Sequence, residues 1–129
     1  MRAKISMFNC FKNFKKDTRE RVILNLVDVY TDSPGCRYES EMPFSGERFR
    51  KELLRPAISD AILNHKVLVV NMDGAFGYSC AFLEEAFGGL IRVEGETFKK
   101  IRPHLEIISK EEPYLIEEIM KYMKEANND

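Results

Sequence analysis

The stretch KVLVVNMDGAFGYSCAFLEEAFGGL, residues 66–90, decides the fold. It begins with the aliphatic run 67–70, which is typical of a central strand covered on both faces. An Asp-Gly pair closes the run, and apolar residues then recur at helical spacing over 82–90, with Glu84 and Glu85 on the other side. The stretch therefore predicts a strand, a turn and an amphipathic helix.

The flanking sequence repeats this alternation. Other aliphatic runs predict further strands, and Ser45 is a candidate N-cap for a helix with one apolar face. Pro56 predicts a kink or a break near 54–55, because proline lacks the N–H group that a helix interior needs. The predicted strands cover 4–11, 21–30 and 104–109, and the predicted helices cover 45–63, 95–103 and 109–129, the last fraying after 126.

Alternating strands and helices indicate an α/β fold with parallel strand pairs wherever a helix intervenes. The 129 residues suit one domain, in which residues 1–20 comprise the N-terminal strand and a charged connection. The net charge of −1 provides no field that would attract nucleic acid or an acidic membrane surface. No apolar run is long enough to span a bilayer and the N-terminus lacks the features of a signal peptide, so we expect a cytoplasmic protein.

The turn 74–81 matches neither the glycine-rich phosphate-binding motifs nor a nucleophile elbow, which needs a glycine where Ala81 stands. Ser79 has two interpretations, as the N-cap of the next helix or as the acceptor of a phosphoryl group. Glu84 and Glu85 are interpreted as a solvated helix face or a partner contact. The two histidines, His65 and His104, are expected elsewhere, so a hydrolase triad is not predicted.

The three cysteines, Cys10, Cys36 and Cys80, form no CxxC pair and have no neighbouring histidine, so no metal site is expected. Each is expected to be a small buried residue. Cys80 has a second interpretation as a reactive thiolate, because the positive end of a helix favours a negative charge. Arg37 lies in the irregular segment 31–44 and is interpreted as an anion contact or as a salt-bridge anchor of that loop.

Three segments together resemble the STAS-like family of uncharacterised bacterial proteins called DUF4325, whose pattern runs PG-x-R, then SGE-x-F-R, then a hydrophobic strand followed by SSFLEEAFGGL. The resemblance spans about residues 22–125 and implies a single STAS-type domain, a mixed sheet of four to five strands with helices mainly on one face. The segments are DSPGCRYESEMPFSGERFRKELLRPA (32–57), VLVVNMDGAFGYSCAFLEEAFGGLIR (67–92) and ISKEEPYLIEEI (108–119).

The family is distantly similar to anti-sigma-factor antagonists, in which the turn after the central strand docks on a histidine-kinase-like ATPase that phosphorylates a serine there. The resemblance implies such a partner for this chain. Cys80 and Ala81 stand where the family has paired serines, which leaves Ser79 as the phosphoacceptor candidate and favours docking without a phosphoryl switch. The implied partner-binding residues are Gly77, Tyr78, Ser79, Cys80, Glu84 and Glu85.

We therefore expect a non-catalytic regulatory interaction domain that needs no cofactor and no metal. The alternative is a sensor of a small ligand or a nucleotide at the same turn, with Arg37 as the anion contact. A third interpretation is an enzyme with Cys80 as its nucleophile.

Overall fold

The computed structural model describes residues 17–41 and 43–127. Its sheet has the order β1-β2-β3, and both neighbouring pairs are parallel. Within the described residues the sheet is therefore wholly parallel and three-stranded, instead of mixed with four or five strands. The predicted strand at 4–11 lies outside the described residues. The strands are β1 (Arg21–Asn25), β2 (Val67–Asn71) and β3 (Leu105–Ile108).

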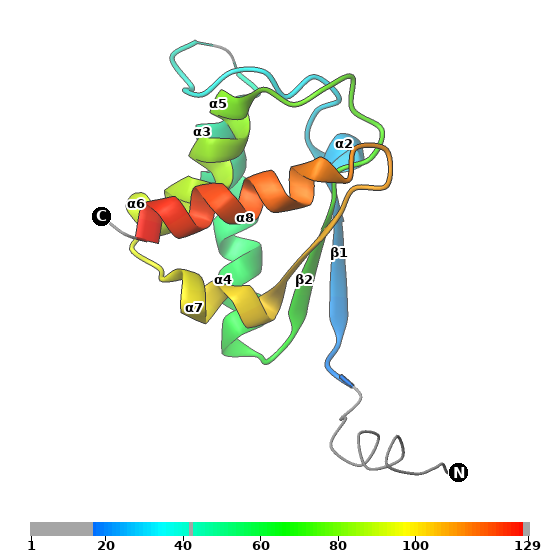
Figure 1. The fold of residues 1–129 in the computed structure, drawn as a ribbon, viewed down its shortest axis with the longest axis vertical. Coiled ribbons are helices and arrows are strands. Elements are labelled where there is room, and N and C mark those ends of the chain that lie inside the picture. Colours follow the sequence, from blue (N-terminus) through cyan, green and yellow to red (C-terminus); the bar gives the residue numbers. More distant parts are fainter. Residues whose placement is uncertain (1–16, 42, 128–129) are drawn as a thin grey trace.

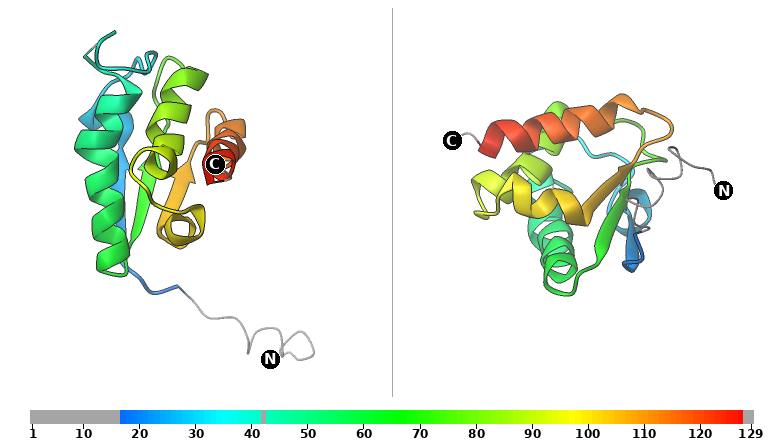
Figure 2. Two further views of the ribbon diagram at one scale, coloured as in Figure 1. Left: turned by 90° about the vertical axis from the view of Figure 1, so that its left-hand side faces the viewer. Right: turned by 60° about the horizontal axis from the view of Figure 1, so that its bottom comes forward.

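Helices fill the connections, as the alternating pattern predicts. The first long rod runs through α3 (Gly46–Phe49), the π-helix η1 (Arg50–Leu54) and α4 (Arg55–Leu63). The second runs through α5 (Cys80–Leu83), the π-helix η2 (Glu84–Gly88) and α6 (Gly89–Arg92). Both rods lie on one side of the sheet, and the C-terminal helix lies beside β3 (Figures 1 and 2). The remaining helices are α2 (Leu26–Val29), α7 (Phe98–Ile101), the 3-10 helix η3 (Arg102–His104) and α8 (Tyr114–Asn127).

The predicted strand 21–30 is wrong in its second half, where the chain forms α2. The pairing of β1 with β2 ends at Asn25 and Asn71, whose side-chain amides are joined by a 3.0 Å hydrogen bond. Beyond Asn25 no described strand lies beside the chain with which the backbone pairing could continue. Leu26 turns into the core with 0% exposure, and its carbonyl accepts the N–H of Tyr30 at 2.9 Å.

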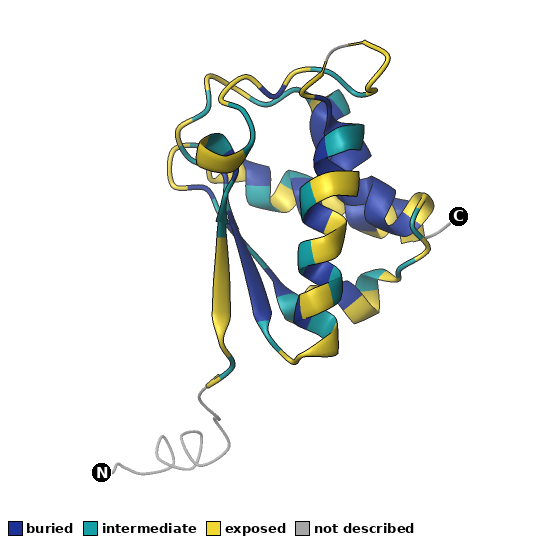
Figure 3. Cartoon of the chain, turned by 180° about the vertical axis from the view of Figure 1, so that it is seen from behind, coloured by how far each residue is buried: buried dark blue, intermediate teal, exposed yellow. Residues whose placement is uncertain are grey.

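The central strand β2 is buried on both faces, which confirms the expectation drawn from its aliphatic run (Figure 3). Leu68 and Val70 belong to the core beneath the helices. Val69 alternates to the other face, where its partner in β3 is Glu106. The guanidinium of Arg21 in β1 donates to both carboxylate oxygens of Glu106, at 2.5 and 2.9 Å, and this bond lowers the pKa of Glu106. The two edge strands are thus joined across β2.

Pro56 does not break its helix, although the sequence predicts a kink or a break there. The backbone N–H of Arg55 donates to the carbonyl of Arg50, one residue farther back than in an α-helix. This π-type turn accommodates the proline, which then occupies the tolerant first turn of α4. The rod continues to Leu63 and keeps one face on the sheet.

The two rods are joined through the buried side chain of Arg50, which is 1% exposed. Its Nη1 donates to the backbone carbonyl and to the carboxylate of Glu85, both at 2.7 Å, and its Nε donates to Glu94 at 3.0 Å. Gly89 makes room for it, because a Cβ at this position would lie 2.3 Å from Nη1. Gly46 likewise lets the rods approach, since a Cβ there would lie 2.6 Å from the carbonyl oxygen of Phe82.

Replacing Arg50 by methionine should lower the free energy of unfolding by about 3–5 kcal/mol, because the carboxylate of Glu85 would stay buried with its closest cation removed. Urea denaturation followed by circular dichroism measures the loss. The control is Arg48→Met, which removes a partly exposed pair with Glu52 and a bond to the carbonyl of Pro43 at the surface and should cost about 1 kcal/mol or less. Equal losses in the two variants would contradict the assigned role of Arg50.

Candidate functional site

The turn after β2 is held by hydrogen bonds to two neighbouring loops. The backbone N–H of Phe76 donates to Asp32 at 2.9 Å, and that of Ser79 to Pro34 at 3.2 Å. On the other side the N–H of Gly74 donates to the carboxylate of Glu111 at 2.8 Å. Gly74 has a φ of +99°, a conformation that side chains disfavour, so the glycine is needed here. The turn 74–81 is therefore a fixed surface feature.

Tyr78 anchors this turn from the inside. Its hydroxyl donates to the carbonyl of Met72 at 2.7 Å, its ring lies 6.2 Å from that of Phe82, and burial raises the pKa of the hydroxyl. Tyr78 thus holds the turn onto the core and presents little of itself to a partner. Its role in partner binding stays a prediction.

Phe76 is the residue that sequence reasoning missed. Its side chain is 88% exposed, the highest value among the large apolar residues that are exposed in the described structure. It stands between Ala75 and Gly77 at the outer part of the turn, and only its backbone N–H bonds to the rest of the domain. The sequence did contain a signal for this exposure. Phe76 stands in a glycine-containing turn and belongs to no helical or strand pattern that would place it in the core.

Ser79 is the N-cap of the second rod, as one of its two interpretations predicts. Its Oγ accepts the N–H of Phe82 at 3.0 Å and donates to the carbonyl of Gly35 at 2.8 Å. The bond that the hydroxyl donates to Gly35 would have to be released before the oxygen attacks a phosphoryl group, because its proton must leave. The phosphoacceptor role stays a prediction.

Cys80 is exposed, so the expectation that it packs beneath the turn is wrong. It opens α5 at the first helical position, from which the side chain faces α8 instead of the core. A hydrogen bond with this thiol, together with burial, raises the pKa of the Tyr122 hydroxyl. Cys36 is half-buried, which only partly meets the expectation of a buried residue.

Glu84 and Glu85 do not form a solvated face, and that interpretation is corrected by the structure. Glu85 is 3% exposed and Glu84 is half-buried. Arg37 donates to Glu84 at 2.5 Å and to Glu85 at 3.2 Å, and Arg92 bonds to both carboxylates. Glu84, and to a lesser extent Glu85, raises the pKa of Arg37. Arg37 is therefore a salt-bridge anchor of its loop, with two anions of its own chain.

The two histidines lie at the other end of the strands from Ser79 and Cys80. His104 contacts the carbonyl of Lys66 at 2.8 Å, just before β2 and β3 begin, and His65 lies in the turn between the first rod and β2. The described residues hold no group of three or more potential metal ligands. Within the same part of the chain, no helix is long and apolar enough to cross a bilayer.

Three parallel strands, with helices filling the connections and packed mainly on one side, define an α/β domain. The sequence model of the family described as STAS-like domain of unknown function (DUF4325) matches residues 45–115. The chain belongs to this family, which confirms the resemblance over the region from the Ser45 cap to Leu115. Comparisons with curated proteins and with solved structures give no match.

Removing the cap tests how firmly the site is fixed. Ser79→Ala should lower the free energy of unfolding by about 1 kcal/mol, because the N–H of Phe82 and the carbonyl of Gly35 both lose a partner. Thermal melting and urea denaturation measure the change. Ser40→Ala, at an exposed loop position, is the matched control and should stay within about 0.5 kcal/mol. A loss as small at Ser79 as at Ser40 would contradict the cap.

Proposed function

We propose that the chain is a non-catalytic, cytoplasmic interaction domain that docks on a histidine-kinase-like ATPase through the turn 74–81. The observation that supports docking is Phe76, an aromatic side chain held outside the core on a turn that is itself fixed. Large exposed apolar side chains of this kind are typical anchors of protein interfaces. The class of partner rests on membership of the STAS-like family and on its distant similarity to anti-sigma-factor antagonists.

The rigidity of the turn supports the same proposal. A partner that binds a turn already held by two neighbouring loops loses little conformational entropy on association. Tyr78 and Ser79 supply this rigidity, so they contribute to docking by placing Phe76 and the exposed Gly77 and Cys80. Glu84 and Glu85 contribute to docking indirectly, because they hold the loop of Arg37 against the second rod.

A phosphoryl switch at Ser79 is a separate question from docking. A phosphate at the N-cap would add nearly two negative charges at a helix N-terminus, which favours them electrostatically. It would also displace the hydroxyl proton that now bonds to Gly35, and so loosen the loop that holds the turn. The leading form of the proposal is docking without phosphorylation, because the bonds at Ser79 already have a structural use.

The alternative, a ligand-sensing turn, gains no support from the two hollows of about 360 and 470 Å³ that lie beside α8. Both hollows lie away from the turn, and neither is lined by any residue between 74 and 81. Arg37, its expected anion contact, is already paired with Glu84 and Glu85.

The docking surface is tested by Phe76→Ala. Truncating an aromatic anchor typically costs 2 kcal/mol or more, so the affinity for the ATPase should fall about 30-fold or further. The measurement is affinity purification of the tagged full chain from its own cells, followed by mass spectrometry and by titration of the recovered ATPase in a calorimeter. A preparation from which wild-type chain recovers no protein of the histidine-kinase-like ATPase class would refute the partner.

Leu63→Ala is the matched control for Phe76→Ala. Leu63 is 78% exposed, but it ends the first rod near the beginning of β2, away from the turn. Its truncation should leave the affinity unchanged within about twofold. The proposed surface would be wrong if Phe76→Ala and Leu63→Ala bound the ATPase equally well.

A further inference from the structure

The turn after β2 is bordered by carboxylates from the loops that hold it. Asp32 lies on one side, where its carbonyl accepts the N–H of Phe76 at 2.9 Å. On the other side the carboxylate of Glu111 accepts the N–H of Gly74 at 2.8 Å. Asp73 directly precedes the turn, and its carboxylate accepts the N–H of Glu111 at 3.0 Å. These three acidic residues therefore lie at the same end of the domain as the exposed ring of Phe76.

Glu112 brings a fourth carboxylate to this end of the domain, where it accepts the hydroxyl of Tyr114 at 3.0 Å. Its charge also acts on Tyr78, the anchor of the turn. Burial is the main cause that raises the pKa of the Tyr78 hydroxyl, and the charges of Asp73, Glu112 and Glu111 raise this pKa further. The three carboxylates are thus close enough to the base of the turn for their charges to add there.

Asp32, Asp73, Glu111 and Glu112 form a group that we call the acidic rim. They accept hydrogen bonds from N–H groups and hydroxyls, but they pair with no cation in the described part of the chain. Lys110, exposed beside Glu111, offsets one of the four charges at most. An ionised carboxylate has about four acceptor positions, so each member of the rim can still accept donors from another molecule.

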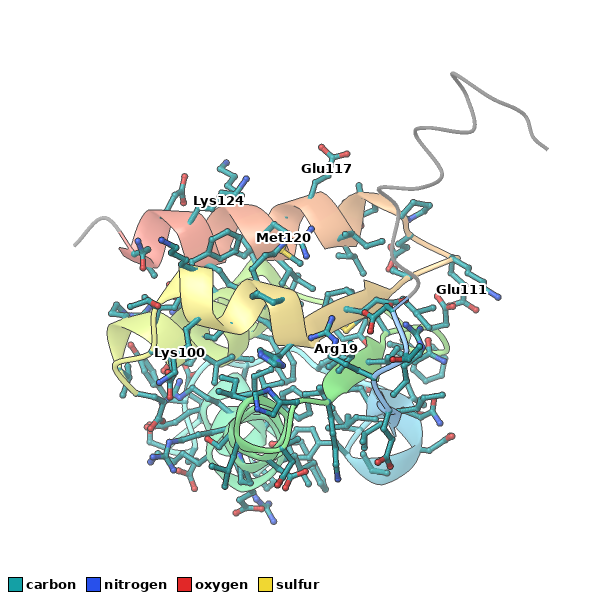
Figure 4. The ribbon with its side chains drawn as sticks, turned by 90° about the horizontal axis from the view of Figure 1, so that it is seen from below. Arg19, Lys100, Glu111, Glu117, Met120 and Lys124 are labelled. Carbon is teal, nitrogen blue, oxygen red and sulfur yellow. The ribbon has the colours of Figure 1, made fainter. Side chains whose placement is uncertain are left out.

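Carboxylates at the other end of the sheet are paired with cations. Asp17 binds Arg19 at 2.8 Å, and Glu106 binds Arg21 at 2.5 Å. Figure 4 shows Glu111 on the loop that follows β3, at the end of that strand opposite to Arg19. A group of unpaired carboxylates therefore borders the turn, where a docked partner would meet it.

We propose that the partner meets this turn with a basic surface, in which an apolar pocket receives Phe76 and lysine or arginine side chains around the pocket pair with the acidic rim. The inference rests on the docking proposed above and adds the chemistry of the partner's surface. It also opposes the alternative of a nucleotide at the turn, because unpaired carboxylates repel an anionic ligand.

The acidic rim has a kinetic consequence. Unpaired charges of one sign attract a partner of opposite sign before contact and raise the rate of association. Dissolved salt screens this attraction, with a Debye length of about 10 Å at 0.1 M ionic strength. Association with a basic partner must therefore slow as the salt concentration rises, whereas the contact of Phe76 with its pocket does not depend on charge.

Neutralising part of the rim tests the inference. An Asp32→Asn, Glu112→Gln double variant of the full chain removes two charges and keeps acceptor oxygens for Ser33 and Tyr114. Its association rate with the recovered ATPase should fall at least about fivefold at low salt, while its dissociation rate changes less than about twofold. Surface plasmon resonance at several salt concentrations measures both rates. The association rate of the variant should also depend less on salt than that of the wild type.

The matched control is a Glu20→Gln, Glu125→Gln double variant, which makes the same change in net charge away from the turn. Both side chains are exposed; Glu20 precedes β1, and Glu125 lies in the last turn of α8. Its association rate should stay within about twofold of the wild type. Equal slowing in the two double variants would show an effect of net charge alone and would overturn the inference. Circular dichroism confirms that both variants fold.

Phe76→Ala separates this inference from the proposed function. If the ATPase loses affinity for Phe76→Ala but associates with the neutralised variant as fast as with the wild type, docking at the turn stands and the basic partner surface is refuted. If the wild-type chain recovers no ATPase, the proposed function is refuted instead.

Charged nitroxide co-solutes measure the potential of the rim without any partner. In nuclear magnetic resonance spectra of the wild type, a cationic nitroxide should relax the amide protons of residues 74–81 and 110–112 at least about twofold more strongly than an anionic one. The amides of β1 serve as the internal reference, and the difference should shrink in the neutralised variant. Equal relaxation by the two co-solutes would overturn the inference, whatever partner is recovered.

Discussion

The arrangement of the helices depends on one buried guanidinium. Arg50 projects from the first rod into the second, where it binds the backbone and the side chain of Glu85 and reaches Glu94. A buried ion pair often stabilises a fold no more than well-packed apolar groups of the same volume would. The main contribution of Arg50 is therefore to set the position of the second rod relative to the first. Its fixed donor geometry places the rods in one relative register. Since Glu85 and Glu84 also bind Arg37, the same contact extends to the loop of Arg37, which bonds to the turn 74–81 through Pro34 and Gly35.

This constraint gives a physical meaning to the residues through which the family is identified. Gly46 and Arg50 belong to the SGE-x-F-R segment, and Glu85 and Gly89 to FLEEAFGGL. The two segments meet across the interface of the rods. Gly46 lies against the backbone of Phe82, and Arg50 binds Glu85 and lies against Gly89. The most characteristic sequence of the chain thus encodes how its helices pack, whereas the turn 74–81 lies in the less distinctive stretch between them.

The sequence predicts the order of strands and helices well, because periodicity and caps are local: the Ser45 cap and the buried central strand follow from neighbouring residues alone. It misplaces Glu85 for a reason that periodicity cannot detect. A glutamate on the apparently polar side of a helix becomes buried when an arginine 35 positions earlier reaches it. Phe76 was missed for the converse reason, since a turn held by distant carbonyls can keep a phenylalanine outside. The end of β1 at Asn25 depends on where β2 ends, which is also a non-local fact.

The parallel sheet gives the domain two unlike ends. All three strands run the same way, so the turn 74–81 is at their carboxyl end, while Asp17 and the junction of η3 with β3 are at the other. Asn127, the last described residue, accepts a hydrogen bond from the N–H of Phe98 and thus lies beside α7 (Figure 1). A fluorophore or a surface tether attached beyond Asn127 would therefore point away from the turn. Immobilisation through that end would present the turn 74–81 to solution in a uniform orientation.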